Sequence, residues 1–420
     1  MSLASNIKTD VPLLERRSHE ERSASQDQQL HHLLTSTIQY IPYYQKAFAN
    51  IDLSHIHDRK SLELLPIIRK DSLIELQANA PPFGGHLPDG LKEADYLFAS
   101  PGPIYEPGFM NAEYWSVVSA LQAANFTEDD VIFNTFSYHL TPGAWIFDSG
   151  ARAIGCPVIP VGSAPRDLQI QALDHYRPTA YCGTPDYLKQ LISFVETDGT
   201  KPLSIKKAMV SGGALTPSLR EFFDEKNVEV LQCYATAEVG VIAYESPARD
   251  GLIVNEDVIL EIIDPDTGKS QPPGLVGEVV VTKLRGSYPL IRFGTGDLSC
   301  LVEGNSPCGR TSPRIQGWLG RADMTTKIKG MFVRPTQINS LVSQLPVLER
   351  ARLIVDRDND KDKSILHCEL SPAEIQDRDE DEIENLIGQK FRDLCHIRAS
   401  ISVVPLGTLP DDGKIIVDLR

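Results

Sequence analysis

Residues 317–335 read GWLGRADMTTKIKGMFVRP, and this stretch divides the chain into two parts of different character. Before it, apolar segments with the period of strands alternate with amphipathic segments with the period of helices. After it, a shorter part follows that is richer in charged residues. We interpret the stretch as a hinge between a large N-terminal domain and a small C-terminal domain.

The size, charge and cysteine content of the chain narrow its class. With 420 residues it exceeds the usual size of one hydrophobic core, so two or three domains are expected. Its net charge of -16 argues against nucleic acid as a partner, because proteins that bind phosphate backbones carry a basic surface. Its seven cysteines are scattered singly, which indicates a reducing compartment rather than a disulfide framework. There is no apolar leader and no apolar run of membrane-spanning length, so we expect a soluble, cytoplasmic protein without a membrane partner.

The start of the chain is predicted to be poorly ordered and then helical. Residues 1 to about 25 are polar, and we expect them to be frayed. From Asp27 to Phe48, apolar residues recur at helical spacing until Pro42 interrupts them. A helical segment is therefore expected before the main fold.

The region from Asp95 to Glu238 repeats the order strand, turn, helix. The predicted strands are 96–99, 131–135, 157–161, 180–182, 207–210 and 228–232. The predicted helices are 142–154, 167–175, 186–195 and 217–225. Such alternation indicates an α/β fold with a mostly parallel sheet, whose ligands collect at the carboxyl ends of the strands. The edge of a site is therefore predicted at the turns that contain Ser100, Ser137, Ser211 and Tyr234.

The segments on either side of the hinge follow other patterns. Residues 251–302 carry period-2 strands separated by turns rich in proline and glycine, which predicts a small antiparallel or barrel-like β unit. After the hinge, we predict a small α+β lobe from helices at 335–345 and 379–394 and strands at 351–355, 365–370 and 399–404. The expected division is a large domain of residues 1–320, a hinge at 321–323, and a small mobile domain of residues 324–420.

Five short motifs, each at the end of a predicted element, follow one another in a defined order. They are Ser-Gly-Gly at 211–213, Tyr-x-x-x-Glu at 234–238, Thr-Gly-Asp at 295–297, Gly-Arg-x-Asp at 320–323 and Gly-Lys at 413–414. Each is weak singly, because such tripeptides also occur in plain turns. Together they resemble the adenylate-forming superfamily, which includes acyl-CoA synthetases, aryl-CoA ligases and peptide-synthetase adenylation domains. The sequences at 41–44, 65–70 and 308–311 also resemble its phenylacetate-CoA ligase branch.

The resemblance implies a nucleotide site. The glycines after residue 210 would let the backbone approach an adenine ring closely. The ring of Tyr234 would lie on the nucleotide, Glu238 would hold Mg²⁺, and Asp297 would accept hydrogen bonds from both ribose hydroxyls. The residues assigned to nucleotide binding in this way are Ser211, Gly212, Gly213, Ala214, Tyr234, Ala235, Thr236, Asp297, Arg310 and Arg321.

The phosphate loop departs most from the superfamily pattern. Residues 100–107 read SPGPIYEP, whereas the superfamily has a Ser/Thr/Gly-rich loop that ends in Lys-Pro. The candidate residues of this loop are Ser100, Gly102 and Tyr105. Loss of one preorganised hydrogen-bond donor to the charge that develops in the transition state typically raises the activation free energy by about 3 kcal/mol. A loop without lysine therefore predicts slow adenylation, unless Tyr105, backbone amides or additional Mg²⁺ coordination compensate.

The implied reaction has two halves. A carboxylate attacks the α-phosphate of ATP, and the catalytic residues Lys414 and Glu238 stabilise the charge that develops. The small domain then rotates about Asp323, and a thiol, most simply CoA, takes the acyl group. An aromatic wall at the end of the second strand suits an aryl or arylacetic acid. Its predicted residues are Phe136, Tyr138, His139, Gly143 and Trp145, with a position in the core as the alternative for Trp145.

The expected cofactors are ATP, Mg²⁺ and CoA. The resemblance to the phenylacetate-CoA ligase branch raises the question of zinc, because some members of that branch hold a structural Zn²⁺ on Cys and His residues near residues 251–257 and 306–311. Here Cys308 is the only member of that cysteine pair and the histidine is missing, so four ligands cannot be assembled and no zinc is expected. Two other interpretations stay open: the adenylate passes to a carrier protein or a reductase, or the chain binds a nucleotide or aryl acid with little turnover. The sequence fixes neither the acid, nor the acceptor, nor the oligomeric state, and it is compatible with a homodimer.

Overall fold

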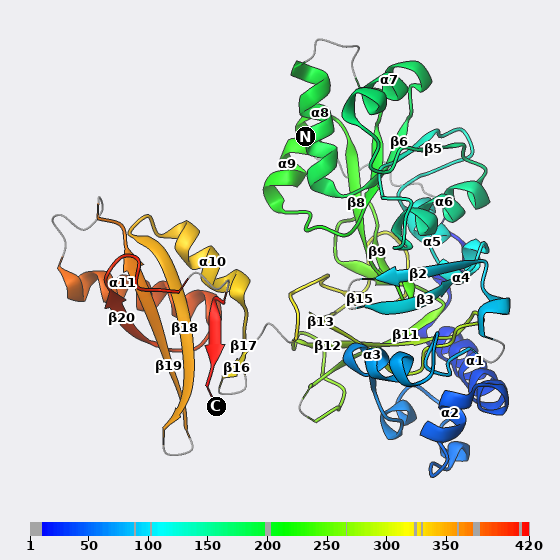
Figure 1. Ribbon diagram of the computed structural model, residues 1–420, viewed down its shortest axis with the longest axis horizontal. Helices are drawn as coiled ribbons and strands as arrows, with labels where there is room; N and C mark the ends of the chain where they lie inside the picture. Colours follow the sequence, from blue (N-terminus) through cyan, green and yellow to red (C-terminus); the bar gives the residue numbers. More distant parts are fainter. Residues whose placement is uncertain are drawn as a thin grey trace. The chain divides into compact units, whose positions relative to one another are not determined.

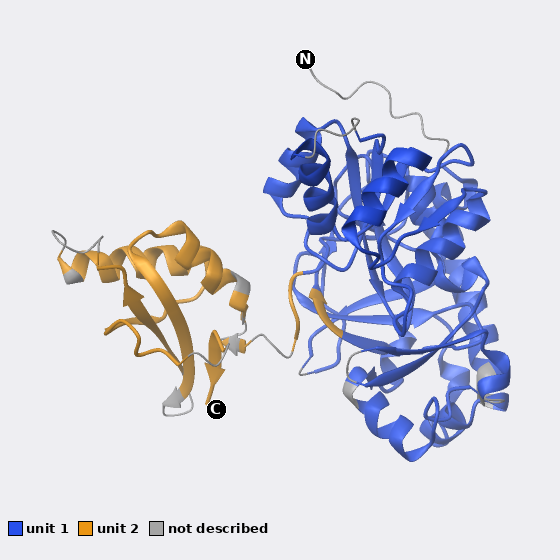
Figure 2. Cartoon of the chain, turned by 45° about the horizontal axis from the view of Figure 1, so that its top comes forward, with its two compact units in different colours: residues 1–295, 299–318 blue, residues 296–298, 319–420 orange. Residues whose placement is uncertain are grey.

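A computed structural model describes residues 11–87, 90–100, 103–197, 203–265, 267–322, 326–328, 331–358, 361–372, 379–410 and 414–419. The chain forms two compact units, one of residues 1–295 and 299–318 and one of residues 296–298 and 319–420 (Figure 2). Residues 296–298 join the smaller unit because the backbone of Leu298 exchanges hydrogen bonds of 2.8 Å with Leu319 and Gly320. The predicted hinge residue Asp323 lies outside the described residues.

A nine-stranded sheet forms the centre of the larger unit (Figure 1). Five of its strands are parallel in the spatial order β5 (Val158–Pro160), β4 (Ile132–Asn134), β6 (Ala180–Gly183), β7 (Lys207–Val210) and β8 (Glu229–Thr236). The sheet continues through antiparallel pairs with β9 (Gly240–Glu245), β10 (Leu252–Val254), β15 (Arg314–Ile315) and β14 (Leu301–Val302). The parallel strands confirm the predicted α/β fold.

Helices connect the parallel strands, as the sequence predicts. They are α6 (Gly143–Ile154), α7 (Arg166–Tyr176), α8 (Pro185–Thr197) and α9 (Pro217–Glu225). In α8 the apolar side chains of Leu188, Leu191 and Ile192 are buried on one face, in a cluster that Phe223 of α9 joins. This apolar spacing explains why the segment forms a helix on the sheet rather than a strand within it.

The predicted strand 96–99 does not belong to the parallel sheet. It forms β2 (Tyr96–Ser100), which pairs in antiparallel fashion with β3 (Ile104–Gly108), from Tyr96 opposite Gly108 to Ser100 opposite Ile104. The prediction fails because residues 104–108 contain Pro107 and Gly108, which obscure the second strand. The described residues of the candidate phosphate loop therefore belong to the end of β2 and to β3 in an antiparallel pair, and not to a strand-to-helix turn.

The predicted β unit at residues 251–302 is divided between two sheets. β11 (Val258–Ile263), β12 (Gly277–Lys283) and β13 (Phe293–Ser299) form a four-stranded sheet with β1 (Ile68–Arg69), which runs parallel to β13. β10 and β14 instead belong to the nine-stranded sheet. Period-2 alternation identifies strands but does not reveal their partners, because pairing depends on distant segments. The Thr-Gly-Asp motif accordingly lies within β13 rather than after a strand.

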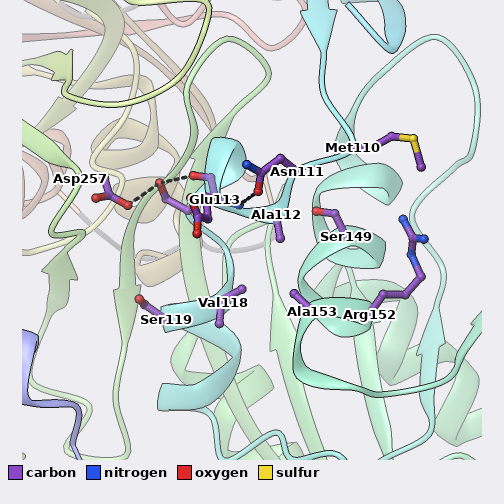
Figure 3. A pocket seen from close by; sticks show the side chains of 11 residues that line it. Met110, Asn111, Ala112, Glu113, Val118, Ser119, Ser149, Arg152, Ala153 and Asp257 are labelled. Carbon is purple, nitrogen blue, oxygen red and sulfur yellow. Dashed lines mark hydrogen bonds between the residues drawn. The ribbon is translucent and has the colours of Figure 1, made fainter. Parts of the chain in front are cut away.

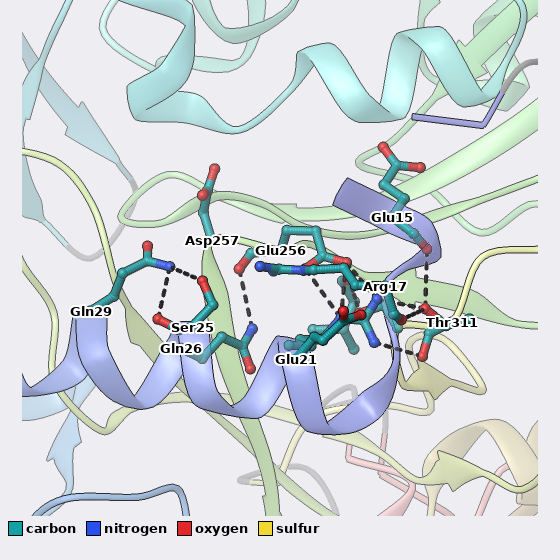
Figure 4. A network of polar contacts seen from close by, with 12 residues as sticks. Glu15, Arg17, Glu21, Ser25, Gln26, Gln29, Glu256, Asp257 and Thr311 are labelled. Atoms are coloured by element: carbon teal, nitrogen blue, oxygen red, sulfur yellow. Dashed lines mark hydrogen bonds and ion pairs between the residues drawn. The ribbon is translucent and has the colours of Figure 1, made fainter. Parts of the chain in front are cut away.

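The N-terminal segment from residue 11 is folded against the larger unit, which corrects the prediction of a frayed start (Figure 4). It contains η1 (Leu13–Arg16), α1 (His19–Tyr40) and α2 (Pro42–Ala47). Arg17 and Arg22 donate to the Glu256 carboxylate over 2.6 and 2.9 Å, and Arg22 is buried. This polar stretch is ordered because it forms hydrogen bonds with residues of the larger unit. These partners are about 230 residues away in sequence, so the local pattern does not reveal them.

The remaining elements of the larger unit are short. They are η2 (Leu53–His55), η3 (Ser61–Leu64), α3 (Lys70–Asn79), η4 (Gly90–Glu93), α4 (Ala112–Trp115) and α5 (Val118–Ala123). None of the helices in the described residues combines the length and the hydropathy needed to span a bilayer.

The smaller unit is an α+β lobe, as predicted. Its sheet has the order β20 (Ser400–Val404), β19 (Lys361–Leu370), β18 (Leu348–Asp358) and β21 (Ile416–Asp418). A separate hairpin joins β16 (Thr326–Ile328) and β17 (Met331–Val333). The helices α10 (Pro335–Gln344) and α11 (Glu380–Cys395) share a core with the strands, to which Leu341, Leu353 and Phe391 contribute fully buried side chains.

Candidate active site

The carboxyl ends of the parallel strands meet at one edge of the nine-stranded sheet. Thr135, just after β4, donates through its hydroxyl to the Tyr181 hydroxyl over 2.8 Å, and Tyr181 donates to the carbonyl of Thr184 after β6. Ser211, just after β7, donates to the carbonyl of Cys233 in β8 over 3.0 Å. These bonds join the ends of β4 and β6 and of β7 and β8, and the backbone N–H of Ser211 donates to the carbonyl of Gly183 in β6 over 3.1 Å, at the place where the sequence predicts a site.

The Ser-Gly-Gly loop presents exposed backbone at this edge. Ser211 is buried, whereas Gly212, Gly213 and Ala214 are exposed. Gly212 has φ of +70°, and a Cβ atom there would lie 3.8 Å from the Phe136 ring. The loop therefore depends on glycine for its conformation and leaves room beside an aromatic ring. A flat ligand ring could occupy that room.

The motif Tyr-x-x-x-Glu turns the chain from β8 into β9. The Tyr234 ring is buried, and its hydroxyl donates to Thr295 Oγ1 over 3.1 Å. Ala235 and Thr236 end β8, and the Thr236 hydroxyl accepts from the backbone N–H of Val239 over 3.2 Å. The turn therefore fixes the carboxylate of Glu238 at the end of the strand.

Glu238 belongs to a buried charged cluster that the sequence does not predict. Its carboxylate is fully buried, and Oε1 lies 2.8 Å from Nζ of Lys70, the first residue of α3. Glu106 in β3 is also buried and accepts from the Ser100 hydroxyl over 2.5 Å. The pKa of Glu106 is raised to about 7, chiefly by burial and also by the nearby Glu238, while the Ser100 hydrogen bond opposes the shift. Two carboxylates and one ammonium are therefore close together.

The residues at this place fit a divalent cation. Oε2 of Glu106 and Oε2 of Glu238 are buried and make no hydrogen bond to any described residue. Carboxylate oxygens are the ligands that Mg²⁺ prefers, and a buried one without a donor is costly unless a cation or proton reaches it. The described residues contain no group of three or more His, Cys, Asp or Glu side chains that could hold a metal by themselves. Any cation here would therefore share its ligands with a substrate or with water.

The candidate phosphate loop is only partly described. Gly102 lies outside the described residues, Ser100 is bonded to Glu106, and Tyr105 has an exposed side chain. The backbone of Tyr105 is fixed by Gln77 of α3, which donates to its carbonyl over 2.7 Å and accepts from its N–H over 2.9 Å. The hairpin is thereby attached to the helix that carries Lys70.

The smaller unit holds the predicted ribose carboxylate. Asp297 and Arg321 form an isolated antiparallel bridge, and their side chains approach to 3.6 Å. Gly296 has φ of +74°, and a Cβ atom there would lie only 2.7 Å from the Arg321 guanidinium. Glycine is required here because any larger residue would displace the arginine.

The predicted catalytic lysine is placed on folded structure. Lys414 is exposed and lies just before β21, which runs parallel to β18 with Leu353 opposite Ile416. The backbone carbonyl of Ile415 accepts from Leu353 over 2.9 Å. The end of the chain is therefore attached to a sheet, and not a solvated tail.

Arg310, which the sequence assigns to the nucleotide site, pairs with a residue of the N-terminal segment. Its guanidinium is buried and forms an ion pair with Glu15 in η1. Glu15 lies in the N-terminal segment, whose polar contacts with Glu256 and Thr311 are shown in Figure 4. We leave Arg310 out of the proposed nucleotide site, because a buried arginine already paired with a carboxylate has no access to a phosphate or ribose.

The aromatic residues of the predicted acyl pocket pack against each other and the core. The Trp145 ring stacks on Tyr96 at 4.6 Å and meets Tyr138 edge-on at 5.2 Å. Phe136 stacks on Phe147 at 4.9 Å and lies 3.7 Å from the Cβ position of Gly143. His139 is exposed. A Cβ atom built on Gly212 would lie 3.8 Å from the Phe136 ring, so Phe136 is the member that borders the room beside the Ser-Gly-Gly loop.

A separate cavity of about 590 Å³ opens beside α4, α5 and α6 (Figure 3). Charged side chains of both signs line it, and Asp257 there pairs with Arg285 at 3.1 Å. The lining residues are Met110, Asn111, Ala112, Glu113, Ser116, Val118, Ser119, Ser149, Arg152, Ala153 and Asp257. This cavity contains none of the residues that the sequence predicts for the site.

Sequence reasoning did not assign Lys70 and Glu106 to the site. The available signal was the position of Glu106 directly before Pro107, where the superfamily loop has lysine. Lys70 gave no signal of this kind, because it reaches Glu238 from a position 168 residues earlier in the chain. Only the fold brings the two together.

Comparison with known proteins gives matches along the whole chain. The family model described as AMP-binding enzyme matches residues 110–285, and the model of the AMP-binding enzyme C-terminal domain matches residues 330–420. The phenylacetate-coenzyme A ligase of Thermus thermophilus is 28% identical over 97% of this chain and 99% of its own length. The phenylacetate-coenzyme A ligase of Aromatoleum evansii is 28% identical over 92% of this chain and 90% of its own length. The phenylacetate-coenzyme A ligase of Escherichia coli is 25% identical over 100% of this chain and 99% of its own length.

Solved structures show a similar fold at lower identity. An open conformation of 2-hydroxyisobutyryl-CoA ligase gives a TM-score of 0.87 at 22% identity, covering 96% of this chain and 93% of that one. The same ligase in a postadenylation state gives a TM-score of 0.75 at 22% identity, covering 100% and 94%. At such identities the likeness concerns the fold.

Proposed function

Because the chain belongs to the adenylate-forming superfamily, in its phenylacetate-CoA ligase-like branch, we propose that it is an AMP-forming acid-thiol ligase. It activates a carboxylic acid with ATP to an acyl-adenylate, releases pyrophosphate, and transfers the acyl group to CoA. The proposal names an aryl or arylacetic acid, since aromatic rings gather beside the Ser-Gly-Gly loop.

One observation carries the proposal. Glu238, the acidic residue of the predicted nucleotide motif, is buried at the end of β8, and one of its oxygens has no described hydrogen-bond partner. Lys70 pairs with its Oε1, so the remaining buried oxygen can still take a cation or proton, and an ATP–Mg²⁺ complex brings a cation.

The residues of the larger unit would bind and orient the nucleotide. The exposed backbone at 212–214 would lie against the adenine, and Phe136 would border the ring. Mg²⁺ bound at Glu238 would neutralise part of the phosphate charge. The Tyr234 ring, fixed by the hydrogen bond from its hydroxyl to Thr295, would lie against the base.

The residues of the smaller unit would act on the ribose and the α-phosphate. Asp297, next to Arg321, would accept hydrogen bonds from the ribose hydroxyls. The Lys414 ammonium would stabilise the negative charge that develops when the acid attacks phosphorus. Movement of this unit about the predicted hinge at Asp323 would then withdraw Lys414 and admit the thiol.

Pyrophosphate exchange tests the proposal. The protein is incubated with ATP, labelled pyrophosphate, Mg²⁺ and a panel of aryl and arylacetic acids, and label entering ATP is measured. We expect exchange with at least one acid and a loss of about a hundredfold or more in Lys414→Ala. Mass spectrometry with CoA or a carrier protein then identifies the acceptor.

One observation favours a second candidate function. Glu106 stands where the superfamily loop has lysine, which weakens phosphate binding and is compatible with a protein that binds an aryl acid or nucleotide with little turnover. Absence of exchange with every acid, together with measurable ATP binding, would establish this second function. The homodimer and the cytoplasmic location stay predictions from the sequence.

A further inference from the structure

The candidate phosphate loop, residues 100–107, carries an acidic side chain at the place where a phosphate-binding ammonium is expected. Glu106 directly precedes Pro107, in the position of the lysine of the Lys-Pro pair. It is buried and bonded to Ser100 on the other strand of the hairpin. The described residues of this loop, Ser100 and 103–107, include no lysine or arginine, so the loop itself brings no positive charge.

A lysine from a different element occupies the space beside these carboxylates. Nζ of Lys70 lies 2.8 Å from Oε1 of Glu238. It is also close enough to lower the pKa of Glu106. Its side chain is 27% exposed, whereas that of Glu238 is 0% exposed. The ammonium therefore lies between the buried carboxylates and the solvent, where a bound polyphosphate could reach it.

The position of Lys70 is fixed by the elements on both sides of it. The two residues before it form β1, in which Ile68 pairs with Phe293 and Arg69 with Gly294 of β13. Later in α3, Gln77 holds the backbone of Tyr105 by two hydrogen bonds. The helix start is thus attached to β13 and to the phosphate hairpin. A donor held in this way needs little reorganisation when charge develops.

We infer that Lys70 supplies, from the start of α3, the phosphate-binding ammonium that the candidate phosphate loop at residues 100–107 lacks. The inference rests on the proposed function. In the adenylation step the acid oxygen forms a bond to the α-phosphorus, and the bond from that phosphorus to the bridging oxygen breaks. The electron pair leaves with pyrophosphate. The Lys70 ammonium donates hydrogen bonds to the β- and γ-phosphate oxygens and gives up no proton.

The competing explanation is that Lys70 only neutralises Glu238. In that case its loss would destabilise the protein and weaken both half-reactions alike. If Lys70 instead contacts the phosphates, its loss would impair adenylation and spare the second half-reaction, because pyrophosphate has already left. The two half-reactions therefore separate the explanations.

The test compares Lys70→Met, Lys70→Arg and the control Lys207→Met. Lys207 is a matched lysine, since its Nζ pairs with Asp130 at 2.9 Å and its side chain is 22% exposed. Pyrophosphate exchange, thioester formation from supplied acyl-adenylate and CoA, ATP affinity by calorimetry, and melting temperature are measured for each. We expect Lys70→Met to lower exchange about a hundredfold, with thioester formation within about threefold of the parent. Lys70→Arg should retain at least a tenth of the exchange, and Lys207→Met should stay within about threefold.

A second variant restores the charge at the loop. Combining Glu106→Lys with Lys70→Met returns an ammonium to the cluster, in the position of the superfamily lysine. We expect this double variant to exchange at least about tenfold faster than Lys70→Met alone. It also keeps the positive partner of Glu238, so it remains informative if Lys70→Met fails to fold.

The outcomes separate the inference from the proposed function. Two outcomes would overturn the inference and leave the proposed function intact. In the first, the parent protein catalyses exchange and Lys70→Met catalyses it at the same rate. In the second, Lys70→Met loses both half-reactions equally and the double variant does not restore exchange. If the parent shows no exchange with any acid, the proposed function fails. The role of Lys70 is then decided by ATP affinity: at least tenfold weaker binding in Lys70→Met supports it, and unchanged affinity overturns it.

Discussion

The buried imidazole of His86 should make the larger unit lose stability in mild acid. His86 is 0% exposed and stacks on Tyr43 at 4.0 Å, and its Nδ1 lies 3.0 Å from the carbonyl oxygen of Phe83. Burial lowers the pKa of His86 to about 4, although the Phe83 carbonyl opposes this. The imidazole is therefore neutral in the folded protein over the whole range in which a histidine in an unfolded chain takes up a proton.

The size of the effect follows from the two pKa values. Above about pH 6.5 neither state binds the proton, so His86 adds no pH dependence there. As the pH falls from 6.5 toward 4, the unfolded chain binds the proton and the folded protein does not, so the free energy of unfolding decreases. At about 1.4 kcal/mol per pH unit, the complete loss is roughly 3 kcal/mol, and roughly 2 kcal/mol is lost at pH 5.

Urea unfolding of the parent and of His86→Phe at pH 7.5 and pH 5.0 measures this. Phenylalanine keeps a ring against Tyr43 but cannot bind a proton. All three tryptophans, Trp115, Trp145 and Trp318, lie in the larger unit, so their fluorescence follows that unit. Relative to the variant, the parent should lose roughly 2 kcal/mol between the two pH values. The variant His31→Phe, on an exposed part of α1, controls for the removal of an imidazole. Parallel pH dependence of the parent and His86→Phe would refute the reasoning.

Three further changes test the site and its support. Arg292→Met removes the guanidinium that donates to both oxygens of buried Glu261 over 2.9 and 3.1 Å. The free energy of unfolding, measured with urea, should fall by about 3–5 kcal/mol, because the Glu261 charge stays buried without its partner. Adding Glu261→Met to this variant should restore part of that free energy. Gly240→Ala places a Cβ atom 2.6 Å from the Trp115 carbonyl oxygen, at a residue with φ of +88°. It should lower the free energy of unfolding by about 2 kcal/mol more than Gly274→Ala, because Gly274 has a similar φ of +82° but a Cβ atom there would meet no atom within 4 Å. Glu238→Gln keeps the shape of the turn but removes the anionic oxygens, so pyrophosphate exchange should fall about a hundredfold and the concentration of Mg²⁺ needed for half-maximal exchange should rise. Unchanged Mg²⁺ dependence in that variant would contradict the assignment of the cation to Glu238.

Much of the candidate site could be predicted because its residues follow strands. The loop at 211–214 and the turn at Tyr234 to Glu238 come directly after β7 and β8, and parallel strands bring their carboxyl ends to one edge. The regular alternation of strands and helices from β4 to β8 identified that edge. The motifs could then be assigned without knowledge of any side-chain contact.

Other assignments failed where the partner of a residue is distant in sequence. Arg310 resembles a nucleotide ligand by its neighbours in the sequence, yet it pairs with Glu15, 295 residues away. The polar segment around Arg17 and Arg22 resembles a frayed end, yet it is bonded to Glu256. Strand 96–99 resembles a member of the parallel sheet, yet its partner is the strand after a proline-rich loop.

By itself, the sequence determined the alternation of elements, the order of the motifs and the change of character around residues 317–335, because hydrophobic period, glycine and proline act over a few residues. Only the tertiary structure decided which charges meet. Lys70, Glu106 and Glu238 belong to α3, β3 and the turn after β8, and folding brings them into one buried cluster. The energy of a buried charge depends on its neighbours in space and on the exclusion of water, and neither is a property of local sequence.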